Sequence, residues 1–248
     1  MRAPRGTTGR EPARRQGLAR TTAASAASPW TRPPDRGAGD AASIKRDAVL
    51  RAAAQLFNDK GYHATSLDMV AERLSVTKPT LYYYVRSKEE ILFECVRLGL
   101  ELMRAAIAEA AGSGGSALDK LEAAMHEYAL IVTMDFGMCL IRVGEDPLAP
   151  ESRKKLRRLK AQIDHEFRSL IEQGVAEGSL APCDPKLAAF TLAGALSWIG
   201  RWYDPAGPVS AEGVVRQSIG LLMHGLSPRP AAPGPQLAPR RSAAEAAP

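Results

Sequence analysis

Cysteines and long apolar runs are both scarce in this 248-residue sequence. The three cysteines, Cys95, Cys139 and Cys183, are an odd number without metal-ligand spacing, so we expect no disulfide framework and a cytoplasmic protein. The longest apolar stretches, such as Leu187 to Ile199, are interrupted by polar residues and glycine, and fall short of the roughly 20 residues that a membrane span needs. No apolar run of secretory type follows the N-terminus, so neither a membrane span nor an export signal is expected.

Residue patterns typical of enzymes are also missing. No two of the four histidines have metal-ligand spacing, and no serine or cysteine stands in a nucleophile motif. The acidic residues Asp135, Glu145 and Asp146 lie in or near predicted turns without an arrangement suited to acid–base work. We therefore expect a protein that is not an enzyme, with no catalytic residue, no metal site and no cofactor.

Alternation of β-branched residues is absent as well, whereas apolar residues recur at intervals of three and four from Ser43 onward. This pattern predicts an all-α protein of about nine helices. Residues 1–42 and 226–248 are rich in small residues and proline and lack an apolar face, so we expect them to be disordered tails, the first of them basic. Between them we predict two folded domains, a smaller one at 43–90 and a larger one at 91–225.

The formal charge of +6 is concentrated in these tails. Residues 43–225 hold 22 basic and 23 acidic side chains, so the predicted folded part is nearly neutral. Residues 45–90 hold eight basic and six acidic side chains, a mild positive bias that does not establish nucleic-acid binding alone.

Residues 65–90 are the most informative segment, because three helix starts follow one another within it. Thr65 with Asp68, and Ser87 with Glu90, have the spacing of a capping box. Thr77 can cap a third helix that has Pro79 in its first turn, where a missing amide proton costs nothing. The segment predicts two short helices joined by a turn at Ser75 and Val76, which is the helix-turn-helix arrangement.

The apolar residues of this segment, from Leu67 to Val85, can pack against the preceding helix and leave polar residues outside. A helix presented in this way fits the DNA major groove, while lysines and hydroxyls at helix starts bind phosphates. The predicted DNA-binding residues are Thr65, Ser66, Thr77, Lys78, Thr80, Tyr82, Tyr83 and Lys88. Tyr82 and Tyr83 are expected to be exposed, and Tyr84 to join the core.

This part of the sequence resembles a known family, the TetR family of bacterial repressors. The resemblance rests on Phe57, Gly61 and Tyr62 at the end of the first helix and on the run TLYYYVRSKEEIL from Thr80 to Leu92. Many members have glycine where this chain has Pro79, so base preferences do not carry over. The resemblance implies nine helices, a homodimer and a palindromic DNA operator. It also implies that residues 43–90 are the DNA-binding domain and that residues 91–225 are a ligand-binding and dimerisation domain that lowers DNA affinity when filled. It also implies that the last two helices, predicted at Pro185–Tyr203 and Ser210–His224, form the dimer interface.

Two features of the larger domain indicate a ligand. Residues 195–210 look like the corresponding segment of regulators of steroid-ring, phenylacetate and fatty-acid breakdown, which respond to acyl-CoA thioesters. Trp198 and Trp202 lie one helical turn apart with Arg201 beside them, so they either line a ligand site or pack in the dimer interface. A basic run from Arg153 to Lys160 is either a solvated face or a site for a CoA pyrophosphate.

Apolar residues of the intervening helices complete the predicted pocket, although the same residues suit a dry core. The predicted ligand-binding residues are Met103, Ile107, Met125, Tyr128, Phe136, Arg157, Phe167, Trp198, Arg201 and Trp202. The function we predict is a TetR-type repressor released from its operator by an acyl-CoA thioester and controlling catabolic or lipid-metabolism genes. The alternative is a repressor of a drug-efflux operon that senses a lipophilic cation, for which Asp135, Tyr128 and Glu145 are candidate residues.

Overall fold

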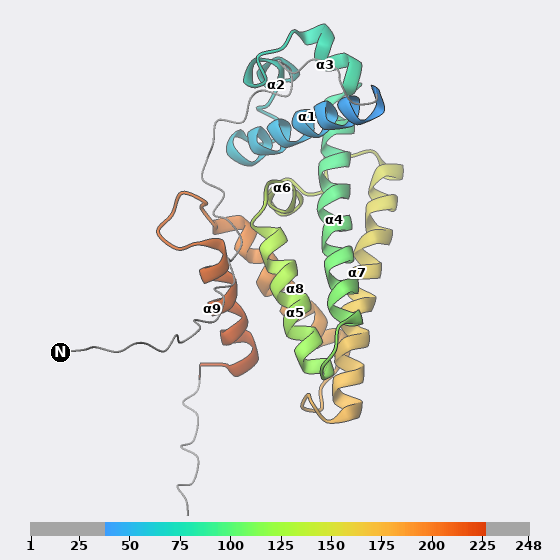
Figure 1. Cartoon of the computed structure of the whole chain (residues 1–248), viewed down its shortest axis with the longest axis vertical. Helices are drawn as coiled ribbons and strands as arrows, with labels where there is room; N and C mark the ends of the chain where they lie inside the picture. The colour runs from blue at the N-terminus through green and yellow to red at the C-terminus, as the bar shows by residue number, and fades with distance from the viewer. Residues whose placement is uncertain (1–37, 227–248) are drawn as a thin grey trace, which may run out of the picture. The chain divides into compact units, whose positions relative to one another are not determined.

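The computed structural model describes residues 38–226, and all the regular secondary structure in that range is α-helical, as predicted. The chain divides into residues 1–45 and a second compact unit from Arg46 onward. The nine helices of the described range are α1 (Ala38–Lys60), α2 (Leu67–Arg73), α3 (Lys78–Tyr84), α4 (Lys88–Gly112), α5 (Ala117–Val132), α6 (Asp135–Arg142), α7 (Pro150–Glu177), α8 (Pro185–Trp202) and α9 (Ala211–His224) (Figure 1).

Side-chain caps begin four of these helices where the sequence predicted them. Thr77, Ser87, Asp184 and Ser210 each accept a hydrogen bond from a backbone N–H in the first turn of α3, α4, α8 and α9, respectively. These bonds satisfy amides that have no partner inside the helix. Gly61 follows the end of α1 with a φ of 85°, the left-handed conformation expected at a C-terminal cap.

Two predicted helix starts were wrong. The cap of α2 is Ser66, whose hydroxyl accepts from the N–H of Met69, and not Thr65. Helix α1 begins at Ala38, inside the segment predicted as a tail; three of its first five residues are alanine, which has the highest helix propensity. The rest of the predicted disorder, at 1–37 and 227–248, lies outside the described residues.

Helices α4 to α9 form a bundle with a shared apolar core. Helix α4 packs on α5, α6 and α7, and α8 packs on the same three helices, while α9 packs mainly on α5. The long helices α4 and α7 run side by side (Figure 1). Because α5 and α7 separate α4 from α8 over much of this bundle, a space left among them is enclosed by helices from several parts of the chain.

The short helix α6 turns sharply away from α5. The two axes differ by 82°, and a Cβ atom at Gly137 would lie 1.9 Å from the carbonyl oxygen of Ile131. Only glycine therefore allows α6 to lie so close to the end of α5. This position brings α6 against α4 and α8 and, through polar contacts described below, against α1.

No single helix of the described range is long and apolar enough to cross a membrane; α5 and α6 pass that test together, by length and composition only, despite the bend between them.

Candidate DNA interface and effector cavity

Helices α2 and α3 are joined by a tight turn. Ser75 has a φ of 55°, and the N–H of Val76 donates to the carbonyl of Ala71 over 3.0 Å. Val70 and Ala71 of α2 and Leu81 of α3 are buried, as the sequence predicted. The inner faces of both helices are thus fixed, and the direction in which the outer face of α3 points is fixed with them.

The outer face of α3 carries polar and aromatic side chains. Tyr83 is 80% exposed and Tyr82 is 46% exposed, while the hydroxyls of Thr77 and Thr80 lie 2.8 Å apart in a hydrogen bond. Tyr84 is half-buried and meets the ring of Tyr83 edge-on. The face therefore offers phenol and threonine hydroxyls from one helix, the groups that contact DNA bases, sugars and phosphates.

Lys78 at the start of α3 forms an ion pair within the DNA-binding domain. Its ammonium lies 2.8 Å from a carboxylate oxygen of Asp68 on α2. The hydrogen bond to Asp68 and then its negative charge raise the pKa of Lys78. Both side chains are exposed, so DNA phosphates can compete with Asp68 for this cation.

Thr65 is a structural residue, in contrast to its predicted role as a DNA contact. Its side chain is 2% exposed, and its hydroxyl lies 2.9 Å from the carbonyl oxygen of Gly61 and 3.2 Å from that of Leu56. The hydroxyl closes the end of α1 and is not available to a ligand. Ser66, its exposed neighbour and the cap of α2, is the hydroxyl that faces outward.

Lys88 also differs from its predicted role as a phosphate contact. Its ammonium donates to the carbonyls of Tyr62 and Thr65 over 2.9 and 3.0 Å, and lies 4.3 Å from the centre of the Tyr62 ring. These contacts tie the start of α4 to the loop between α1 and α2. Lys88 is thus engaged within the protein, whereas Lys78 is the exposed lysine among the predicted residues.

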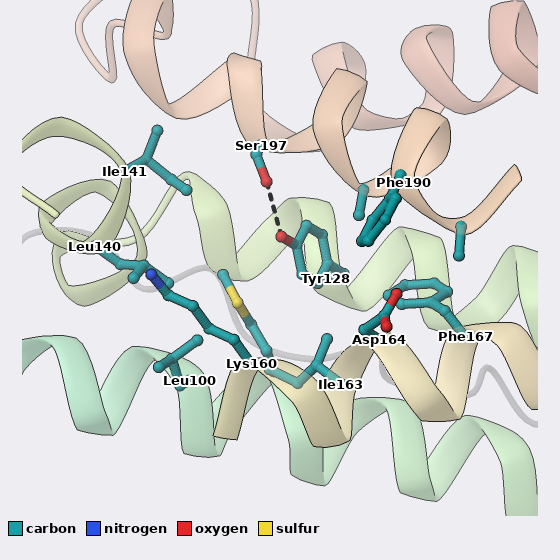
Figure 2. A pocket seen from close by; sticks show the side chains of 13 residues that line it. Leu100, Tyr128, Leu140, Ile141, Lys160, Ile163, Asp164, Phe167, Phe190 and Ser197 are labelled. Carbon is teal, nitrogen blue, oxygen red and sulfur yellow. Dashed lines mark hydrogen bonds between the residues drawn. The ribbon is translucent and has the colours of Figure 1, made fainter. Parts of the chain in front are cut away.

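A mostly apolar cavity of about 340 Å³ lies among helices α4 to α8. Figure 2 shows its wall, with α7 on one side and α8 on the other. It is lined by Leu100, Met103, Tyr128, Leu140, Ile141, Lys160, Ile163, Asp164, Phe167, Ala189, Phe190, Ala193 and Ser197. Three predicted ligand residues, Met103, Tyr128 and Phe167, are part of this wall.

The polar groups of the cavity are few. The phenol of Tyr128 points toward Ser197 across the cavity, and the two hydroxyls are 2.7 Å apart (Figure 2). Burial raises the pKa of Tyr128, while the hydrogen bond to Ser197 opposes this shift, so the phenol stays protonated and can donate to a ligand. Lys160 and Asp164, one helical turn apart on α7, are the charged lining residues, and Asp164 is paired with Arg168.

Three other residues predicted to bind the ligand do not line the cavity. Ile107 and Met125 are fully buried among other side chains, and Phe136 lies on α6 with the guanidinium of Arg51 5.4 Å from its ring centre. Their periodicity correctly placed them inside, but they fill the core. The lining residues from α8, such as Phe190 and Ser197, were missed, because that helix had been interpreted mainly as a dimer surface.

Trp198, Arg201 and Trp202 also lie away from the cavity. Trp198 is 65% exposed and Trp202 is 54% exposed, both on the outer face of α8. Arg201 is exposed and donates to the carbonyl of Arg142 over 3.4 Å. Of the two alternatives left open by the sequence, the position of the tryptophans favours the dimer interface.

The outer faces of α8 and α9 carry an apolar surface built around small residues. Trp198 and Trp202 continue a row on α8 that includes Gly194, and α9 adds Gly220 and Leu221. A Cβ atom at either glycine would meet nothing within 4 Å, so both positions are open in the single chain. Exposed large apolar side chains around flat glycine positions suit the close approach of helices from a second copy.

Arg157, the remaining predicted ligand residue, lies in a separate groove at the start of α7 rather than in the cavity wall. Its Nε lies 3.1 Å from an oxygen of Glu145.

Helix α6 connects the cavity to the DNA-binding domain. On one side its Leu140 and Ile141 line the cavity. On the other, the carboxylate of Asp135 accepts from Gln55 of α1, and Arg142 donates to the carbonyl of Asn58 of α1 over 3.5 Å. Arg142 also donates to the carbonyls of Gly200 and Tyr203 at the end of α8, each over 2.8 Å. A ligand that displaces α6 would therefore also displace α1 or break these hydrogen bonds.

Two short helices with an exposed polar face, joined to a helical domain that encloses a cavity, define a helix-turn-helix regulator. Residues 49–95 match the model of "Bacterial regulatory proteins, tetR family", and residues 114–226 match that of "Tetracyclin repressor-like, C-terminal domain". The chain belongs to the TetR family of transcriptional regulators.

Relatives and solved structures support this assignment. The transcriptional repressor KstR2 of Mycolicibacterium smegmatis is 26% identical over 193 residues, which is 74% of this chain and 91% of that protein. The structure of PfmR from Thermus thermophilus superposes with a TM-score of 0.67 at 33% identity and covers 73% of this chain and 99% of PfmR. AibR in complex with isovaleryl coenzyme A and operator DNA has a TM-score of 0.64 at 26% identity, with 71% of this chain and 97% of AibR covered.

Proposed function

We propose that this protein is a homodimeric repressor that holds a palindromic operator through α3 and releases it when an acyl-CoA thioester fills the cavity, thereby controlling catabolic or lipid-metabolism genes. It acts in the cytoplasm and has no catalytic activity of its own. The single observation that carries the proposal is that α6 forms part of the cavity wall and is also hydrogen-bonded to α1 of the DNA-binding domain.

The proposed DNA contacts are the half-buried Thr80 and five exposed residues of the predicted set: Ser66, Thr77, Lys78, Tyr82 and Tyr83. A single α3 buries little DNA surface, whereas two copies held about 34 to 36 Å apart read successive major grooves of a palindrome. The apolar surface of α8 and α9 supplies the second copy. Dimerisation is thus part of DNA recognition and not a separate property.

The chemistry of the cavity supports an acyl thioester. An acyl chain needs apolar walls, which most of the lining residues provide, and the Tyr128 and Ser197 hydroxyls can donate to a thioester or acyl-chain oxygen. The complex of AibR with isovaleryl coenzyme A shows such a ligand in one relative. To release DNA, the ligand must bind the released conformation more tightly than the DNA-bound one.

A lipophilic cation suits the cavity less well. A carboxylate without a partner would favour such a ligand, but Asp164 is paired with Arg168, and Glu145 is paired with Arg157 and Lys160. Asp135, the third candidate, is engaged by Gln55. A cation would have to displace one of these partners, and Lys160 at the cavity wall would repel it.

The test uses the full chain and a fluorescent duplex selected by the protein from a random library. Isovaleryl-CoA and octanoyl-CoA are titrated against the complex, with free CoA and a cationic dye as comparisons. We expect at least one thioester to lower operator affinity about 5- to 150-fold, the usual range of allosteric coupling, and free CoA to do much less. Release by the dye but by neither thioester would overturn the proposed effector class.

A further inference from the structure

The first turns of α7 form a strongly basic groove next to the effector cavity. The groove has a volume of about 560 Å³ and is lined by Pro150, Glu151, Arg153, Lys154, Arg157, Arg158 and Ala161. We call it the α7 groove. Arg153, Lys154 and Arg158 have no acidic partner in the described part of the chain, so three of its cations are uncompensated.

The α7 groove leads to the cavity along one helix face. Arg153, Arg157, Lys160 and Asp164 follow one another at intervals of three or four residues, so their side chains share a face of α7. The first two line the groove and the last two line the cavity. At 1.5 Å per residue, about 15 Å of helix separates Arg153 from the middle of the cavity wall at Ile163.

Glu145 lies where the two spaces meet. Its carboxylate is 3.1 Å from the Nε of Arg157 and 3.3 Å from the ammonium of Lys160, and its side chain is only 15% exposed. The buried Oε2 atom has no hydrogen bond. Glu145 therefore neutralises the two cations where the groove and the cavity meet, but its Oε2 atom forms no hydrogen bond with Lys160. An anionic ligand can replace the Glu145 carboxylate beside these cations.

The start of α7 also adjoins the DNA-binding domain. The helix has no side-chain cap of its own, and the N–H of Ala149 donates to the carboxylate of Glu89 in the first turn of α4 over 2.8 Å. The positive end of the helix dipole adds to the field of the arginines. A ligand with several negative charges would meet both, and would disturb a contact with the helix that follows α3.

We propose that the α7 groove binds the phosphates of the effector, with the adenosine bisphosphate end of an acyl-CoA in the groove, its pantetheine arm passing Lys160 and its acyl group in the cavity. This inference rests on the proposed function. Arginine forks match phosphate oxygens in pairs, and an uncompensated arginine cluster suits the charge and geometry of a diphosphate. The cavity alone accommodates the acyl end, so the groove accounts for the larger and charged part of the molecule.

The test compares two effectors that share an acyl thioester, of which only one carries phosphates. Isovaleryl-CoA and the isovaleryl thioester of N-acetylcysteamine carry the same acyl group, but the second has no nucleotide. We expect the variant with Arg153→Gln and Arg158→Gln to need at least about tenfold more isovaleryl-CoA for half-release of the operator, the scale of losing charge-assisted hydrogen bonds. Its response to the short thioester should match that of the wild type.

Lys155→Gln is the matched control, because Lys155 lies in the same exposed run of α7 but outside the groove, and it should respond like the wild type. A wild-type response of the groove variant to both thioesters would overturn the inference and leave the proposed function intact. Loss of operator affinity by the groove variant without any effector would also overturn it, because the groove would then be a DNA contact.

Calorimetry with the adenosine bisphosphate part of coenzyme A keeps the groove testable if neither thioester releases DNA. In that event the proposed function fails. Binding of this nucleotide to the wild type, together with its loss in the groove variant, would still support a phosphate site. No binding to the wild type would overturn the site as well.

Discussion

The carboxylate of Asp135, at the start of α6, accepts a hydrogen bond from the side-chain amide of Gln55 on α1 over 2.9 Å. The oxygen of the same amide accepts from Arg73 of α2, also over 2.9 Å. A chain of two side-chain hydrogen bonds thus joins the helix at the cavity wall to the first helix of the helix-turn-helix. Asn58 adds a second bond by donating to the backbone carbonyl of Asp135.

Asp135→Ala should weaken communication between the cavity and DNA. The substitution removes the acceptor for Gln55 but leaves the backbone bond to Asn58, so operator affinity without effector should change little. The concentration of acyl-CoA for half-release should rise about fivefold, corresponding to roughly 1 kcal/mol of lost coupling. Titration of the operator complex with effector measures both quantities.

Asp135→Asn is the control for this experiment, because asparagine retains an oxygen that Gln55 can reach. It should release DNA like the wild type. Equal release by the alanine variant would show that the coupling runs through other contacts, such as those of Arg142.

When DNA binds, a phosphate or a base should replace Asp68 as the partner of Lys78. Lys78→Ala is expected to weaken operator binding about tenfold and to lower the slope of log affinity against log salt by about one charge. Asp68→Asn removes the competing carboxylate and should tighten binding a few-fold, since an exposed ion pair is easily exchanged. Fluorescence anisotropy at several salt concentrations measures these effects, and unchanged affinity in both variants would contradict the assignment of α3.

His126 on α5 should make stability depend on pH through its contact with α9. Its Nε2 lies 3.0 Å from the carboxylate of Glu212. Burial lowers the pKa of His126, but hydrogen bonds to Glu212 and Glu127 outweigh this effect, and the pKa is raised above its ordinary value of 6.5. The stabilisation is therefore complete below the unfolded-state pKa and is lost as the pH rises through the folded-state pKa.

We expect the wild type to melt at a higher temperature than His126→Gln at about pH 5.5, and the difference to shrink by about pH 8.5. Both proteins must be compared at one concentration, because dimerisation affects the melting temperature. Glu212→Gln should reduce the pH dependence in the same way. A difference that grows with pH would contradict the sign.

The sequence predicted those features that depend on neighbouring residues. The caps at Thr77, Ser87 and Asp184 were correct because each bonds an amide within the next turn of the same helix. Thr65 and Ser66 were confused because both hydroxyls have nearly the right spacing, and only the packing of Thr65 against the end of α1 separates them. Contacts between distant segments decide such cases.

The cavity was only partly predictable for the same reason. Helical periodicity shows that Met103 and Ile107 both face inward. It does not show that Met103 lines the cavity whereas Ile107 packs against other side chains. Similarly, the size of Trp198 shows that it needs a partner, but not whether that partner belongs to the same chain. Lys88 appeared to be a surface cation because the carbonyls that it binds lie in a loop far away in sequence.

Gly194→Leu should separate the role of α8 in dimerisation from its role in the fold of one chain. A Cβ atom at this position would meet nothing within 4 Å in the single chain, and leucine favours a helix over glycine by roughly 1 kcal/mol. The folded monomer should therefore tolerate the substitution, while a second copy packed against the outer face of α8 would clash with the leucine side chain. We expect sedimentation to show monomers at concentrations where the wild type is dimeric, and operator binding to fall with the loss of the dimer. Gly112→Leu, at an equally open position at the end of α4, should remain dimeric, and a dimeric Gly194→Leu variant would place the interface elsewhere.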